Sequence, residues 1–331
     1  MLIVKPNYYD SFRCIAGSCP DSCCKEWEVQ VDDDAAARYR SLPGALGDRL
    51  RQVLRDTESG TLMTITDGRC PMWRSDGLCR IQAELGEEAL CQVCRDFPRL
   101  RHDYGNFVEL GLELSCPEAA RLIFSAPDLP AITKVSPGGE DPDYDEDAME
   151  VLKASREQAL ALLRDEERSV AQRLALLLLY GYQAQAELDG GEVLPFDPDA
   201  ALESAREFAR EGSIPELAAF CQGLEILDSA WPQRLAAARQ PAFSPLCLPL
   251  ARYLVQRYWL QAVSDYDLSC RVKFMVVTCL LVSSLPGDFT ENAQRYSKEI
   301  ENNADNVDAL LDAAYSHPAF TDDRLLGLLG L

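Results

Sequence analysis

The stretch CPDSCCKEWEVQVD, residues 19–32, places three cysteines within six positions and continues into a tryptophan and an alternating, strand-like run. Nine of the thirteen cysteines lie between Cys14 and Cys116, and the other four lie in apolar, helix-like sequence. Those four, Cys221, Cys247, Cys270 and Cys279, are expected to be small buried hydrophobic residues. The stretch therefore marks a cysteine-rich N-terminal region followed by a cysteine-poor remainder.

Composition and charge narrow the classes of protein that fit. The chain has 331 residues, 47% hydrophobic and 26% charged, with a formal net charge of -22. A phosphate backbone would be repelled on average, which argues against nucleic-acid binding. The start MLIVKPNYYD lacks the pattern of a secretory signal, and the longest apolar runs are too short to cross a bilayer. We therefore expect a cytoplasmic protein with no membrane-spanning segment, in which clustered thiols are reduced and indicate metal binding or catalysis before disulfides.

The N-terminal region mixes strand and helix signals. Strands are expected at 27–31 and 61–66, and a hairpin over 100–114 that turns at Gly105-Asn106. Helices are expected at 32–54, 86–97 and 117–124, the last with proline in its first turn.

Residues 130–142 are rich in proline and glycine and predict a linker, which runs into an acidic stretch at 140–150 with seven acids and no base. That stretch is interpreted as solvated, with a patch for a basic partner as the alternative. Beyond it, apolar residues recur at helical spacing, and helices are expected at 145–165, 169–188, 198–211, 215–228, 246–264, 268–284, 290–301 and 305–315. The predicted fold is mostly α: a cysteine-rich α+β region at 1–130, a linker at 131–144 and an all-helical domain at 145–331.

Spacing alone leaves the chemistry of the nine cysteines open. A structural zinc ion needs four ligands, and an iron–sulfur cubane also takes four cysteines, so nine candidates exceed either need. Some thiols must then pack or support the ligands, or two sites exist. A cysteine nucleophile is a further alternative, but it does not account for the other thiols.

Several motifs are similar to those of the flagellin lysine-N-methylase family. They are F-x-C-I-x-G-x-C-x-D-x-CC-x-x-W at 12–27, CP-x-W-x4-LC-x-IQ-x-x-LGE-x-x-L at 70–90, CRDFPR at 94–99, LSCPEAARL at 114–122 and YSKEIENNADNV at 296–307. The resemblance runs along nearly the whole chain in matching order. A broader likeness connects it to zinc- or iron-chelating cysteine-cluster proteins.

The resemblance implies methyl transfer from S-adenosylmethionine to lysine side chains of flagellin, with a [4Fe-4S] cluster. The cysteines that match the family pattern, and are implied as the metal ligands, are Cys14, Cys19, Cys23, Cys24, Cys70, Cys79, Cys94 and Cys116. Cys91 falls where that pattern has serine and is the first candidate for a non-ligand. No G-x-G-x-x-G loop follows a strand, so a Rossmann-type donor site is absent from the sequence. The alternative function is a chelating or redox-sensing module without catalysis.

Other residues carry weaker expectations. His102 is expected at the surface, with a general base as the alternative, and His317 is expected to be structural. Arg95 and Arg99 are expected at the surface or beside a cluster sulfur or a substrate carboxylate. Tyr8, Tyr9 and Trp27 are expected to be core residues, with a pocket lining as the alternative. Tyr296, Lys298, Glu299 and Glu301 are expected to form a solvated helix face, with a strip facing substrate as the alternative.

Overall fold

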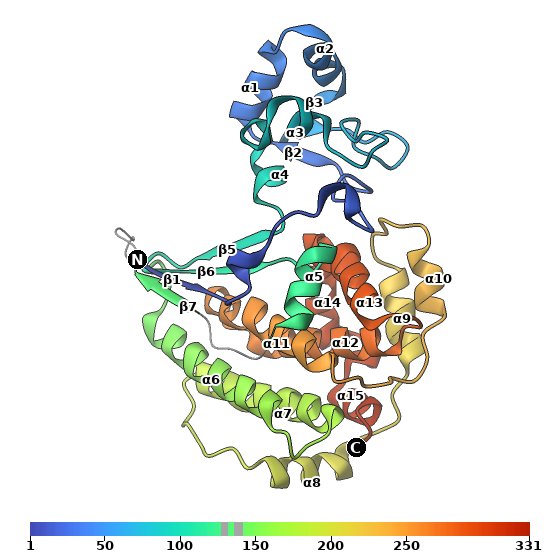
Figure 1. Cartoon of the computed structure of the whole chain (residues 1–331). Coiled ribbons are helices and arrows are strands. Elements are labelled where there is room, and N and C mark those ends of the chain that lie inside the picture. Colours follow the sequence, from blue (N-terminus) through green and yellow to red (C-terminus); the bar gives the residue numbers. More distant parts are fainter. Residues whose placement is uncertain (127–131, 136–141) are drawn as a thin grey trace.

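Two separate groups of buried apolar side chains organise the chain. The computed structural model describes residues 1–126, 132–135 and 142–331. The smaller core is drawn from residues between Val29 and Cys91, and the larger from residues between Phe12 and Leu329. In Figure 1 the segment of the smaller core, coloured from blue to teal, forms a lobe that projects from the helical body. We call residues 29–91 the small lobe and the rest of the described chain the body.

The small lobe packs short helices on a three-stranded antiparallel sheet. Its strands are β2 Val29–Val31, β4 Gly60–Met63 and β3 Leu54–Thr57, in the order β2-β4-β3, with Val29 opposite Met63. The single helix expected at 32–54 is two helices, α1 Asp33–Ser41 and α2 Gly44–Val53, because Pro43 lies between them. The lobe ends with α3 Arg80–Leu85 and the 3₁₀ turn η3 Glu87–Ala89.

A four-stranded sheet forms one edge of the body. Its order is β5-β6-β1-β7, with β5 Arg99–Asp103, β6 Phe107–Leu112, β1 Leu2–Lys5 and β7 Ile132–Val135. The expected hairpin is confirmed, since Gly105 supplies the positive φ of +77° that its turn requires. β1 runs parallel to β6 and antiparallel to β7. Within the predicted linker, β7 is a strand, and residues 131 and 136–141 lie outside the described part.

Helices build the rest of the body. Most fall where apolar periodicity placed them: α5 Pro117–Ser125, α6 Glu146–Arg164, α7 Val170–Leu188, α8 Pro198–Phe208, α9 Ile214–Gln222, α11 Cys247–Tyr258, α12 Leu268–Ser284, α13 Phe289–Tyr296 and α14 Ala304–Ser316. Two short helices were not expected, α10 Trp231–Ala236 and α15 Asp322–Leu328. The predicted class, mostly α with an α+β N-terminal region, is confirmed.

The centre of the body is α12, every residue of which is buried. It contacts α7, α11 and α14, so its largely apolar sequence is that of a helix packed on all sides. Cys270 and Cys279 lie on it, and both are buried, as are Cys221 and Cys247, which confirms the expectation for these four. Across the described residues, no helix combines the length and apolarity that crossing a membrane requires.

Candidate functional site

The nine N-terminal cysteines come from both sides of the junction between small lobe and body. Cys19 follows the 3₁₀ turn η2 Ala16–Ser18, and Cys23 and Cys24 lie in the loop before β2. Three more cysteines occupy the N-cap positions of helices: Cys79 before α3, Cys91 before α4 Gln92–Asp96 and Cys116 before α5. None of these three thiols caps its helix by a side-chain hydrogen bond. The fold therefore brings together thiols that lie about a hundred positions apart in sequence.

Three of the thiols are in direct contact. The Cys24 thiol is hydrogen-bonded to those of Cys23 and Cys70, and the backbone N–H of Cys70 donates to the carbonyl of Cys24 over 2.7 Å. The hydrogen bond with Cys24 lowers the pKa of Cys70 to about 7, although burial opposes the shift. The same pairing lowers the pKa of Cys23 and raises that of Cys24. This pairing thus lowers the pKa of two of the three thiols, which favours the thiolate, the form that binds metal.

The remaining cysteines surround this trio. Burial raises the pKa values of Cys19, Cys79 and Cys116, and the charge of Cys23 adds to each of these shifts. Cys91 and Cys94 form a second thiol–thiol contact, which lowers the pKa of Cys91 and raises that of Cys94. Cys14 acts on Cys19 in the same manner. We call the nine cysteines together the thiol centre.

The donor set suits a metal, although a closed chelate is not formed. Zinc and iron–sulfur clusters both take cysteine thiolates. In the described part of the chain, however, no three His, Cys, Asp or Glu side chains are arranged to hold a metal ion. The eight predicted ligands therefore remain a prediction, and so does the exclusion of Cys91, whose thiol contacts that of Cys94.

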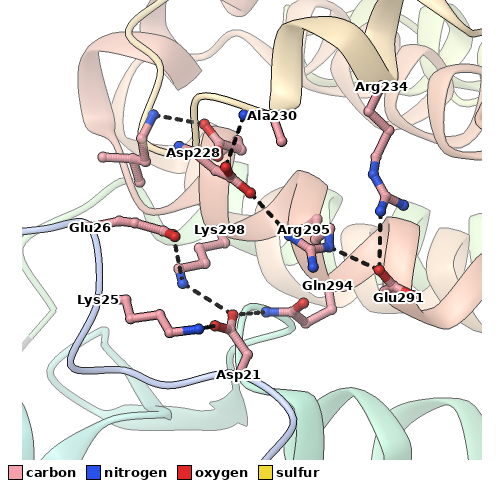
Figure 2. A network of polar contacts seen from close by, with 12 residues as sticks. Asp21, Lys25, Glu26, Asp228, Ala230, Arg234, Glu291, Gln294, Arg295 and Lys298 are labelled. Carbon is pink, nitrogen blue, oxygen red and sulfur yellow. Dashed lines mark hydrogen bonds and ion pairs between the residues drawn. The ribbon is translucent and has the colours of Figure 1, made fainter. Parts of the chain in front are cut away.

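A buried lysine ties the cysteine loop to the body (Figure 2). The ammonium of Lys298 lies 3.0 Å from Oδ2 of Asp21 and 2.9 Å from Oε2 of Glu26, and 5.0 Å from the centre of the Trp27 ring. Only 5% of the Lys298 side chain is exposed. Glu26 takes a left-handed φ of +77°, which costs a side-chain-bearing residue about 1 kcal/mol. The lysine thus fixes the loop on both sides of Cys23 and Cys24.

Gln294 strengthens the same junction. Its Nε2 donates to Oδ2 of Asp21 over 3.2 Å and to the carbonyl of Ser115 over 2.6 Å. Ser115 precedes Cys116, so one side chain joins two segments of the thiol centre. Lys25, on the solvent side, adds a longer contact of 3.4 Å to Asp21.

The helix that carries Lys298 is not the solvated face that was one expectation for 296–301. Residues Ser297–Glu301 form η5, a π-helical turn, and all five are buried. The carboxylates are buried because they have partners: Glu299 accepts the backbone N–H groups of Leu227 and Asp228, and Glu301 accepts the Tyr258 hydroxyl over 2.8 Å. Such π-helical insertions are frequent at functional sites.

An acid-lined groove of about 690 Å³ is lined in part by α4, the helix that follows Cys91 and carries Cys94. Asp32, Asp33, Asp96 and Glu113 line it, against one cation, Arg99. Asp32 is structural, because its two oxygens accept the N–H groups of Ala35 and Gln92 and so cap α1 and α4. The other carboxylates give the groove an excess of negative charge next to the thiol centre. Sequence reasoning missed Glu113, whose only signal was its place three residues before Cys116.

The weaker expectations are settled by the positions of the side chains. Tyr8, Tyr9 and Trp27 pack as partly buried residues against the two cores, and Tyr8 also lines a cavity of about 360 Å³ on the body. Arg95 lies at the surface, 3.8 Å from Asp96. The Arg99 guanidinium lies over the ring of Phe12, 5.2 Å from its centre. His317 is structural, as expected, because it accepts the N–H of Ala319.

His102 is half-buried rather than exposed, which corrects the expectation of a surface residue. Burial and the charge of Arg257 lower its pKa, so the imidazole is neutral at neutral pH.

Fold and site together define a class: a cysteine-cluster protein whose thiol centre lies between a small lobe and a helical body. Comparison with known proteins shows the family to which the chain belongs. The chain is 33% identical over 137 residues to the flagellar biosynthetic protein FliU of Salmonella muenchen, a match that spans 39% of this chain and 81% of that protein. It belongs to the same family, that of the flagellin lysine-N-methylases, as its motifs indicated.

Two further relatives carry the enzymatic name. The chain is 32% identical over 139 residues to the lysine-N-methylases of Salmonella typhimurium and Salmonella choleraesuis. Each match spans 40% of this chain but only 35% of the relative. No family model matches the chain, and no solved structure matches it.

Proposed function

We propose that this protein transfers methyl groups from S-adenosylmethionine to lysine side chains of flagellin. The proposal rests on the acid-lined groove at the edge of the thiol centre, together with the names of the relatives. A lysine ammonium is attracted to carboxylates, and it must lose its proton before its nitrogen can attack a methyl group. Asp33, Asp96 and Glu113 offer that attraction, and carboxylate or water takes the proton.

The transfer balances without a further reactant. A bond forms between the lysine nitrogen and the methyl carbon, the bond between that carbon and the donor sulfur breaks, and S-adenosylhomocysteine leaves. The residues of this chain bind the lysine side chain in the groove, orient its nitrogen and accept its proton. Because the groove is open along α4, an exposed lysine on a folded protein can reach it.

We also propose that the thiol centre holds a [4Fe-4S] cluster. The contacting trio Cys23, Cys24 and Cys70 would supply ligands first, and Cys94, Cys79, Cys19, Cys116 and Cys14 complete the predicted set. Such a cluster, when bound, supplies a redox-active or Lewis-acidic centre. The chain's own part is to collect the thiolates and to hold their loop through Lys298 and Gln294.

The test is a methylation assay with anaerobically purified protein, several flagellins and labelled donor. We expect label on flagellin lysines, with a mass increase of about 14 Da for each methyl group added. The double variant Asp33→Asn/Asp96→Asn should reduce methylation. The control Asp199→Asn, which alters an exposed aspartate outside the groove lining, should not.

Absence of label with cluster-replete protein on every flagellin would contradict the methylase. The alternative, a chelating or redox-sensing module, would then stand, and the 35% coverage of the lysine-N-methylases leaves room for it. Full activity in folded protein without a cluster would support the methylase and would show that the metal has only a structural role. The proposal also places the reaction in the cytoplasm, before flagellin is exported.

A further inference from the structure

A second cavity lies on the body, between the four-stranded sheet and the helices α6 and α11. Its volume is about 360 Å³, within the range of small-molecule sites. Leu100 and Gly111 line it from β5 and β6, Arg156 and Leu160 from α6, and Tyr253 and Arg257 from α11. We call it the sheet–helix cavity. Neither the thiol centre nor the acid-lined groove needs it.

The wall of this cavity combines opposite charges with an apolar floor. Arg156, Glu157 and Arg164 follow one another along α6, and Glu109 faces them from β6. Arg156 and Glu109 form a two-pronged ion pair of 2.9 and 2.7 Å. Apolar lining comes from the strands, so the cavity presents polar and apolar sides. That combination suits a ligand with a zwitterionic head and a flat apolar body.

Two polar atoms at the cavity have no partner within the described chain. They are Nε2 of His102 and Nε of Arg156, and both are buried. Buried polar groups are nearly always hydrogen-bonded, so an orphaned pair at one cavity calls for an explanation. His102 lies opposite Glu109 in the β5–β6 ladder, which places these groups on one face of the sheet. A ligand that donates and accepts hydrogen bonds would satisfy them.

The cavity adjoins the acid-lined groove. Residues adjacent in sequence line the two spaces: Leu100 and Leu112 line the cavity, and Arg99 and Glu113 line the groove. Arg257, in the cavity, lies 3.7 Å from Glu113, in the groove. This long ion pair is the shared wall of the two spaces.

We infer that the sheet–helix cavity is the methyl-donor site, binding S-adenosylmethionine and S-adenosylhomocysteine. The inference rests on the proposed function. The amino-acid head of the donor carries a carboxylate for the arginines of α6 and an ammonium for Glu109 or Glu157, and its purine fits the apolar floor. No Rossmann loop competes for the role. Transfer then requires the Arg257–Glu113 pair to part, because the methyl carbon and the lysine nitrogen have to meet.

Direct binding of both nucleosides to the full chain, by calorimetry, tests the inference without relying on activity. Gly111→Val fills the cavity: a Cβ at Gly111 would lie 3.7 Å from that of Leu100, an ordinary contact, and the added methyls extend over the floor. We expect at least a tenfold loss of affinity. Arg101→Val is the matched control, on the neighbouring strand but outside the lining, and should bind as the unaltered protein does.

His102→Leu separates binding from folding. It removes an unpartnered buried nitrogen, so the melting temperature of the free protein should hold or rise, while loss of one hydrogen bond should weaken binding roughly threefold to tenfold. Unchanged affinity in both cavity variants, or no binding of either nucleoside to folded protein, would overturn the inference. If Gly111→Val methylates flagellin at the normal rate, the donor site lies elsewhere, and the proposed function is unaffected. If Gly111→Val loses donor binding but the unaltered protein does not methylate flagellin, the donor site would stand and the proposed function would fall.

Discussion

At the residue scale, Lys298 is the cation on which the cysteine loop depends. Lys298→Met would keep much of the side-chain volume but leave Asp21 and Glu26 without the ammonium between them. Removing one partner of a buried pair costs about 3–5 kcal/mol, and the partial exposure of the two carboxylates places the expected loss near the lower figure, about 3 kcal/mol. Urea unfolding measures it.

Lys25→Met is the matched control for that substitution. Lys25 contacts the same Asp21, but at 3.4 Å and with 31% of its side chain exposed. Exposed pairs contribute about 0–1 kcal/mol, so this variant should lie within about 1 kcal/mol of the unaltered protein. Equal losses from both lysines would contradict the role given to Lys298.

The cysteines yield a second prediction at this scale. Serine at Cys24 or Cys70 should reduce both bound iron and soluble yield, because metal binding and folding are coupled at such sites. Alanine at Cys221, which is wholly enclosed by the body, should leave the metal content unchanged. Iron and acid-labile sulfide near four each per chain are expected for one cubane. One zinc per chain in colourless protein would contradict the cluster, and loss of metal from Cys91→Ser but not Cys94→Ser would reverse the ligand assignment.

Residue types in sequence anticipated some roles and not others. An isolated cysteine in an apolar helix has few alternatives to burial, so the four in the body were predicted correctly. A charged helical stretch such as KEIE, residues 298–301, has two alternatives, exposure to solvent or burial beside a partner, and periodicity does not distinguish them. The partners of Glu299, the N–H groups of Leu227 and Asp228, lie about seventy positions away. Only the folded chain reveals them.

At the scale of elements, sequence signals succeeded where they were local. The glycine turn fixed the β5–β6 hairpin, and the capping box of Ser169 with Gln172 marks the start of α7. β1 was missed because four residues carry too little pattern, and its partners lie over a hundred positions away. The sheet–helix cavity depends on that pairing, so it too was beyond the reach of the sequence.

Close approach of α7 and α12 gives a prediction for one glycine. A Cβ on Gly181 would lie 2.8 to 3.0 Å from the side-chain carbons of Val272, below normal contact. Alanine usually favours a helix over glycine by about 1 kcal/mol, but overpacking costs about 1–3 kcal/mol, so Gly181→Ala should be neutral to destabilising. Adding Val272→Ala should relieve the clash, and the pair should be more stable than the sum of the single losses. Strict additivity in melting experiments would show that the two helices do not meet at this point.

At the scale of the whole molecule, the net charge of -22 governs encounters with other proteins. If flagellin docks through lysines, its association should weaken as salt rises, because exposed charges are screened beyond about 8 Å at physiological ionic strength. Binding measured between 50 and 500 mM salt should therefore show a falling association rate. An affinity that is constant or rises with salt would indicate an apolar interface instead.

The division into two cores gives the last prediction, on metal removal. The small lobe spans 63 residues, counted from 29 to 91, and its buried apolar set is far smaller than that of the body. Domains of about 60 residues bury only about 60% of their unfolded surface and are marginal without a staple. The proposed metal at the thiol centre would stabilise the lobe, since Cys70 and Cys91 belong to the lobe core itself.

Chelation of the metal should expose peptide bonds within 29–91 to limited proteolysis while a fragment of the body persists, as identified by mass spectrometry. Leu50→Ala, a core truncation in the lobe, should open the same bonds with metal present, and Leu254→Ala in the body should not. Cleavage spread evenly over both cores after chelation would show that the two unfold as one unit and that the metal does not act on the lobe first.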